Sequence, residues 1–76
     1  MSTGRMDLVR LLGENVKRER LRQGLTQDTL AVEAGMRRSY LSDLERGVRN
    51  PSVHALGRLA MALKVEAASL LRVHLN

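Results

Sequence analysis

The segment from Leu25 to Gly47 constrains the fold more than any other part of this 76-residue chain. Thr26 is a good N-cap, because its hydroxyl can accept a hydrogen bond from a backbone N–H of the first helical turn. The pattern after it predicts a helix that ends at Gly35, since glycine adopts the left-handed conformation without a Cβ penalty. Met36 then fills the turn, and a second short helix follows. The segment therefore predicts two short helices hinged at a glycine.

The second of these helices keeps its hydrogen-bonding side chains out of the core. Leu41 and Leu44 alone supply its narrow buried stripe. The other positions are polar: Arg37, Arg38, Ser39, Tyr40, Ser42, Asp43 and Arg46. A helix that exposes such a face meets the requirement for entering the DNA major groove. The spacing is that of a helix-turn-helix.

Size and charge are consistent with one small domain and a polyanionic partner. Thirteen Lys and Arg, eleven of them Arg, oppose eight acids, which gives a net charge of +5. Arginine binds phosphates bidentately, although charge alone does not establish nucleic-acid binding. Cysteine is absent, so we expect no disulfide and no thiolate metal site. The sequence has no apolar run of membrane-spanning length and no apolar signal segment, so we expect a cytoplasmic protein.

The flanking segments predict three further helices and no strand. Residues 1–6 lack periodicity and are expected to form a flexible tail, whereas residues 7–76 form one domain. A first helix over residues 7–23 follows from Leu8, Leu12 and Val16 at helical spacing. A fourth begins after the N-cap Ser52, with an apolar stripe of Val53, Leu56, Leu59, Ala60 and Leu63, and Gly57 allows close packing. A fifth, shorter helix carries Ala67, Leu70 and Leu71. The prediction is an all-α fold of five helices.

At these residues the sequence resembles the Cro and phage-repressor type of helix-turn-helix protein, also called the xenobiotic-response-element family. The resemblance runs from about Leu12 to Leu71, and its most telling stretches are Gly24–Gln27, Ala34-Gly35, Leu41–Gly47 and Asn50–Ser52. It implies a five-helix, lambda-repressor-like DNA-binding domain. Within the family, Arg38–Leu41 and Glu45–Gly47 are similar to controller proteins of restriction–modification systems, a pattern that general bacterial and prophage regulators share.

The resemblance implies that DNA contacts gather around the second and third helices. Gln27 matches the family's phosphate and base-edge contact, and Arg38 and Ser39 match its base contacts. Arg38 could bind guanine O6 and N7 bidentately, with a phosphate clamp as the alternative. The other expected contacts are Arg37, Tyr40, Ser42, Asp43, Arg46, Arg49 and Asn50. For Tyr40 the alternative is a hydrophobic lid over the turn, and for Asp43 it is a negative selector among sequences.

Four positions bear on the scaffold, and one of them, Arg37, is also among the expected DNA contacts. By resemblance, Arg20 and Glu45 form an internal ion pair that joins the first helix to the end of the third. Arg37 stands where the family has a small capping residue, so the third helix is expected to begin without a side-chain cap. Glu19 stands where relatives often have Leu or Ala, which would rotate the inner face of the first helix towards Leu21.

The leading hypothesis is a regulator that binds a palindromic operator in double-stranded DNA as a homodimer. Apolar residues beyond the needs of the core mark the expected dimer interface: Leu71, Val73 and Leu75. The alternative is a protein–protein interaction module on the same fold, such as an antitoxin. RNA polymerase or a toxin protein are further candidate partners. We expect no enzyme activity, metal or cofactor, since His54 and His74 lack ligand partners at metal spacing.

Overall fold

The computed structural model describes residues 7–74, which form four α-helices and one 3-10 turn and contain no strand. The elements are α1 (Leu8–Arg22), α2 (Gln27–Ala34), α3 (Arg38–Glu45), α4 (Val53–Leu63) and η1 (Ala67–Leu71). The all-α prediction is confirmed. The tail predicted for residues 1–6 and the expected interface residue Leu75 lie outside the described residues. Among residues 7–74, no helix is long and apolar enough to cross a membrane.

The count of five helices is not confirmed, because the segment predicted as a fifth, shorter helix is a 3-10 helix of five residues and not an α-helix. So short a segment cannot offset the cost of nucleating an α-helix, and short runs are where 3-10 geometry is common. Arg72 then leaves the turn in extended conformation, with φ −88° and ψ 140°. The Leu70 carbonyl oxygen accepts a hydrogen bond from the Asn15 side chain. The described fold is therefore four α-helices and a turn.

Local capping signals set the helix boundaries as predicted. The Thr26 hydroxyl accepts from the Thr29 backbone N–H at 3.0 Å, and the Ser52 hydroxyl accepts from the Ala55 N–H at 3.1 Å. Gly35 ends α2 in the left-handed region, with φ 68°. Arg37 occupies the N-cap of α3 and makes no side-chain cap hydrogen bond, which confirms that expectation.

Leucines from all four helices meet in one core. The fully buried side chains are Leu30, Leu41, Leu44, Leu59, Leu63 and Val16. Two residues predicted on apolar stripes lie outside this core, because each occupies the first turn of its helix, where the helix extends past its neighbours. Leu8 is 52% exposed and Val53 is 85% exposed.

The predicted rotation of α1 towards Leu21 is also wrong. Leu21 is 56% exposed, whereas Leu12 and Val16 face the core. Glu19 does not need an apolar environment, because it accepts hydrogen bonds from the Arg22 and Gln23 side chains. These bonds, with that of Arg22 the largest cause, lower the pKa of Glu19.

Close helix packing occurs at a different glycine from the one expected. Gly57 has open space where a Cβ would stand, so the packing role predicted for it is wrong. At Gly13 a Cβ would lie 2.3 Å from the main-chain oxygen of Leu44 and 3.0 Å from that of Glu45. Gly13 thus lets α1 approach the backbone of α3 directly.

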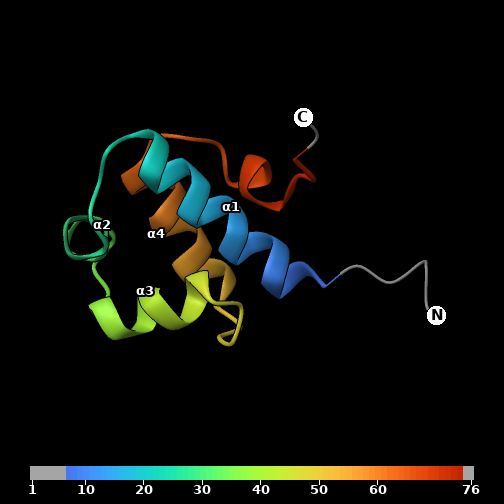
Figure 1. The fold of residues 1–76 in the computed structure, drawn as a ribbon, viewed down its shortest axis with the longest axis horizontal. Coiled ribbons are helices and arrows are strands. Elements are labelled where there is room, and N and C mark those ends of the chain that lie inside the picture. The colour runs from blue at the N-terminus through green and yellow to red at the C-terminus, as the bar shows by residue number, and fades with distance from the viewer. Residues whose placement is uncertain (1–6, 75–76) are drawn as a thin grey trace.

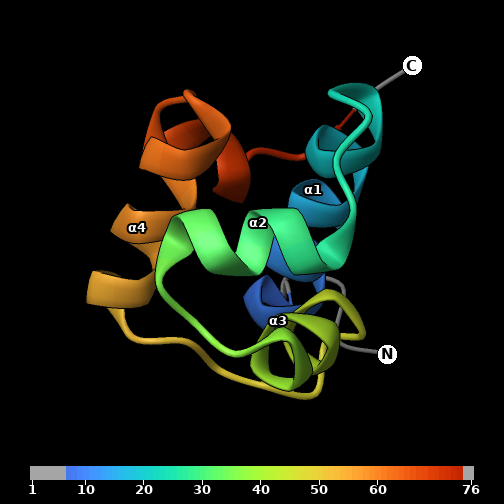
Figure 2. The same cartoon turned by 90° about the vertical axis from the view of Figure 1, so that its left-hand side faces the viewer.

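The helices are arranged so that α3 lies at one edge of the molecule (Figures 1 and 2). Figure 1 shows α2 nearly end-on and Figure 2 shows α3 nearly end-on, so the two helices cross steeply. The long helix α1 packs against α3 and against η1. In both views α3 and η1 lie on opposite sides of α1.

Candidate nucleic-acid interface

One side of α3 packs against the hydrophobic core through Leu41 and Leu44, and its polar N-terminal residues are exposed. Leu41 and Leu44 are completely buried, while Arg37, Arg38 and Ser39 at its N-terminal end are exposed. The N–H groups of a helix's first turn have no partner within the helix and favour an anion such as phosphate. The N-terminal end of α3 can therefore present both backbone and arginine donors to one ligand.

Arg38 has a weak internal partner. Its Nε lies 3.4 Å from Asp28 Oδ1 on α2, and the two side chains are 65% and 77% exposed. An exposed pair of this kind contributes roughly 0–1 kcal/mol, so an incoming phosphate or base can replace it. Asp28 was not among the predicted site residues, although it lies in the first turn of α2, where it pairs with Arg38 of α3.

The C-terminal half of α3 and the loop after it form a charged cluster around Asp43. Asp43 Oδ1 accepts from Arg46 Nη2 at 2.7 Å, and its Oδ2 lies 3.8 Å from Arg49 Nη2. The Arg49 guanidinium also lies over the Tyr40 ring, 4.9 Å from its centroid. Tyr40 is half-buried and packs against the core. Asp43 therefore orders two arginines beside an aromatic ring.

The remaining predicted contacts belong to α3 and to the loop after it. Ser42 is partly buried on α3, and Asn50 is exposed in the α3–α4 loop. The predicted set as a whole contains four arginines and a single aspartate. The surface is thus positive, as a polyanionic ligand requires.

Gln27 is tied to the scaffold at the start of α2. Its Nε2 donates to Glu45 Oε1 at 3.0 Å. Both Glu45 oxygens also accept from Arg20, Oε2 from Nε at 2.7 Å and Oε1 from Nη2 at 3.1 Å. The side chains of Arg20 and Glu45 are only 10% and 3% exposed. The internal ion pair is confirmed, and it also orients a residue predicted to contact DNA.

Sequence analysis missed two polar residues that shape the interface or its support. Arg58 on α4 donates from Nε to the Ala34 carbonyl oxygen at 3.0 Å, which satisfies an orphan acceptor at the C-terminal end of α2. Asn15 on α1 is buried, with 6% exposure. No local signal identifies Arg58, because its partner lies 24 residues away. For Asn15 the sequence did offer a signal, because an asparagine next to the core position Val16 of an amphipathic helix can be buried and then needs hydrogen-bond partners.

The expected dimer residues lie away from α3. Leu71 is 38% exposed and Val73 is 45% exposed, both at the C-terminal end of the described chain. Leu71 also borders an apolar groove of about 260 Å³, whose other walls include Leu8, Val53 and Leu56. Exposed apolar groups are thus grouped around Leu71.

Comparison with known proteins assigns the α2–α3 arrangement to a family. A family model described as helix-turn-helix matches residues 16–70. The chain belongs to the helix-turn-helix family. Both helices of the motif, residues 27–45, lie inside the matched range.

Relatives within this family are regulators. The chain is 46% identical over 65 residues to the uncharacterized HTH-type transcriptional regulator y4dJ of Sinorhizobium fredii, covering 86% of this chain and 84% of the relative. It is similar to the crystal structure of the restriction–modification controller protein C.AhdI from Aeromonas hydrophila, with 42% identity, a TM-score of 0.80, and coverage of 84% and 96%. A third similarity is to the controller protein C.Esp1396I, solved as a tetramer with its natural 35 base-pair operator. That match has 29% identity, a TM-score of 0.78, and 87% coverage of both chains.

Proposed function

We propose that this chain is a sequence-specific DNA-binding transcription regulator of the restriction–modification controller type, which binds an inverted-repeat operator as a homodimer. The observation that carries the proposal is the exposed N-terminal half of α3, with Arg37, Arg38 and Ser39 on a helix fixed by two buried leucines. The operator complex of a related controller supports it. The regulator acts in the cytoplasm and requires neither a cofactor nor a catalytic step.

The proposed contacts divide into base contacts and backbone contacts. α3 enters the major groove, where Arg38 and Ser39 face base edges. Contacts to phosphate fix the position of the protein without reading sequence. We assign these to Gln27, Arg37, Ser42, Arg46, Arg49 and Asn50, while Tyr40 and Asp43 order the arginines around them.

We place the dimer contact at the exposed apolar residues of the C-terminal segment. Leu71 and Val73 belong to it, and Leu75 extends it beyond the described residues. Two-fold dimers with this motif bind half-sites whose centres are about 34–36 Å apart, one turn of DNA. Dimer formation and operator binding are therefore coupled.

Selection from a random DNA pool by the purified protein tests the proposal. We expect enrichment of a short inverted repeat, and an affinity that falls steeply with salt because each neutralised phosphate releases counterions. A selection at low salt that enriches no sequence would contradict it.

A matched pair of arginine variants tests the division of contacts. Arg38→Ala should reduce discrimination at one base position by roughly 1–3 kcal/mol, whereas Arg49→Ala should weaken all sequences alike. The measurement is the affinity of each variant for the selected operator and for its single-base substitutions. A uniform loss of affinity in Arg38→Ala would assign Arg38 to a phosphate instead.

The dimer surface is tested by Leu71→Glu combined with Val73→Glu. We expect a folded monomer by sedimentation and circular dichroism, with weak operator binding. Val32→Glu is the control, because Val32 is 79% exposed on α2 and lies outside the proposed interface. An undiminished dimer in the double variant would move the interface elsewhere.

A further inference from the structure

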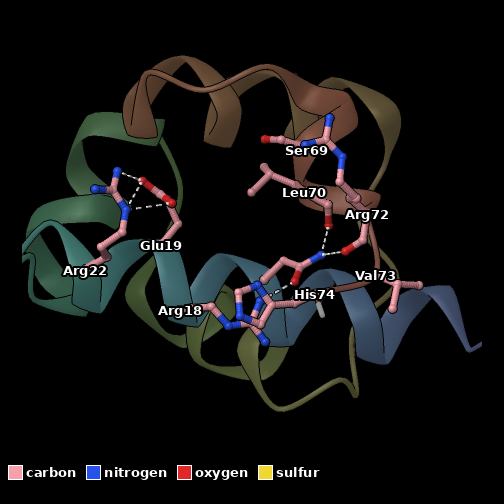
Figure 3. A pocket seen from close by; sticks show the side chains of 9 residues that line it. Arg18, Glu19, Arg22, Ser69, Leu70, Arg72, Val73 and His74 are labelled. Carbon is pink, nitrogen blue, oxygen red and sulfur yellow. Dashed lines mark hydrogen bonds and ion pairs between the residues drawn. The ribbon is translucent and has the colours of Figure 1, made fainter. Parts of the chain in front are cut away.

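Asn15 is a buried polar residue on α1 that makes two hydrogen bonds to the C-terminal segment and one to Arg18 of its own helix. Its Nδ2 donates to the Leu70 and Arg72 carbonyl oxygens, each at 2.8 Å. Its Oδ1 accepts from Arg18 Nη1 at 2.6 Å. Only the amide nitrogen can donate to two carbonyl oxygens, so this pattern fixes the orientation of the side chain. Figure 3 shows the two carbonyl oxygens directed at one nitrogen.

The two carbonyl groups that Asn15 holds flank the proposed dimer contact. They belong to the residues on either side of Leu71, and the second directly precedes Val73. Apolar packing also anchors this segment, because η1 lies against both α1 and α4. Leu70 is its buried apolar side chain, and the Arg72 backbone N–H makes a long bond of 3.4 Å to Ser69. The bonds from Asn15 therefore hold Leu71 and Val73 in a defined position on α1.

The same helix holds the DNA-contacting helix on its opposite side. Two residues before Asn15, Gly13 packs directly against the backbone of α3. About two helical turns after Gly13, Arg20 binds both carboxylate oxygens of Glu45 at the end of α3. Figures 1 and 2 show η1 and α3 on either side of α1. α1 therefore connects the proposed dimer surface to α3: Asn15 holds the C-terminal segment on it, and Gly13 and Arg20 hold α3.

We propose that Asn15 is a positioning residue that fixes the distance and angle between the two α3 helices of the dimer, and so determines which half-site spacing the dimer accepts. This inference rests on the proposed function. One added base pair moves a half-site by about 3.4 Å along the DNA and rotates it by about a tenth of a turn. If the C-terminal segment is held rigidly, the two α3 helices cannot both reach the displaced half-sites, and the dimer binds the altered DNA weakly. If the segment is loose, the helices can adjust, and the dimer binds both spacings.

Asn15→Asp tests the proposal with almost no change in shape. The carboxylate cannot donate, and it places an oxygen against two carbonyl oxygens, so both bonds to the segment are lost. Arg18→Ala is the matched control, because it removes the bond to Oδ1 and leaves both donated bonds in place. Each protein is titrated with the selected operator and with the same duplex carrying one base pair more or fewer between the half-sites.

We expect the wild type and Arg18→Ala to prefer the selected spacing strongly. In Asn15→Asp this preference should fall and the dimer dissociation constant should rise by roughly thirtyfold, the effect of losing two neutral hydrogen bonds. Preference for half-site sequence should remain. A lower Tm with the wild-type spacing preference would show that Asn15 is structural only, and would overturn the proposal.

Two further measurements keep the outcome decisive. If Asn15→Asp does not fold, Asn15→Ala is judged by the same criteria. In the wild-type dimer, NMR should find the Asn15 side-chain amide protons protected from solvent exchange, and unprotected protons would overturn the proposal without any variant. A wild type that neither dimerises nor selects an inverted repeat would instead refute the proposed function.

Discussion

Removing the Glu45 carboxylate should destabilise the fold severely. Glu45 accepts two hydrogen bonds from Arg20 and one from Gln27, all from side chains. In Glu45→Ala the Arg20 guanidinium, in a side chain only 10% exposed, would keep its hydrogen bond to the Leu25 carbonyl oxygen at 2.8 Å. A buried cation would then have no counter-charge.

The expected magnitude is large for a domain of this size. Breaking a buried pair by removing one partner costs about 3–5 kcal/mol. At roughly 0.05–0.15 kcal/mol per residue, the free energy of unfolding of 76 residues is about 4–11 kcal/mol. Because 1 kcal/mol shifts the Tm of such a domain by about 4–8 °C, Glu45→Ala should lower the Tm by about 12 °C or more.

Thermal unfolding followed by circular dichroism measures this effect, with an exposed pair as control. Arg22 pairs with Glu19 on α1, and the Arg22 side chain is 67% exposed. Arg22→Ala should lower the Tm much less than Glu45→Ala does, because solvent screens an exposed pair. A cycle with Arg20→Ala and the double variant isolates the coupling, and we expect the double variant to lose less than the two single variants combined. A Tm of Glu45→Ala within about 3 °C of the wild type would refute the reasoning, since that is under 1 kcal/mol.

Three further predictions concern caps, glycines and pH. Arg37→Ser should raise the free energy of unfolding by about 1 kcal/mol, because serine can cap α3. The same variant should bind DNA more weakly, and the slope of log affinity against log salt should become less steep by about 0.9, the value for one phosphate contact. Gly13→Ala should destabilise the fold, because its Cβ would meet backbone 2.3 Å away, whereas Gly57→Ala, with open space, should stabilise α4 by up to about 1 kcal/mol in the same melting assay. The hydrogen bond from Arg22 lowers the pKa of Glu19, so ionised Glu19 stabilises the fold at neutral pH. This contribution disappears as the pH falls below the ordinary value of 4.5, and the Tm difference between wild type and Glu19→Gln should shrink on acidification.

Sequence alone predicted the features whose causes are local. Thr26 and Ser52 cap the helices that follow them, and Gly35 adopts the left-handed conformation, because each depends on a few neighbouring residues. The buried leucines of α3 follow from helical spacing in the same way. The ion pair between Arg20 and Glu45 came from the family resemblance, since residues 25 apart carry no local sign of contact.

Features that depend on the packing of distant segments were not predictable in this way. Gly13 and Gly57 are both glycines inside helices, and only the crossing with α3 makes the first of them irreplaceable. Asn15 resembles an ordinary polar position, because its acceptors lie 55 and 57 residues later. Leu8 has the spacing of a core residue, but it is the first residue of α1 and is 52% exposed, because it lies outside the buried cluster.

Gln27 links the stability of the scaffold to the DNA surface. A primary amide has two N–H donors, and Gln27 uses one of them for Glu45, so the second can donate to a phosphate while the first fixes its direction. Because Arg20 in turn holds Glu45, the orientation of a proposed DNA contact depends on a buried ion pair. In Glu45→Ala, Gln27 becomes free to rotate. The folded fraction of that variant, measured well below its Tm, should therefore bind every DNA sequence more weakly, and an unchanged affinity would remove Gln27 from the proposed interface.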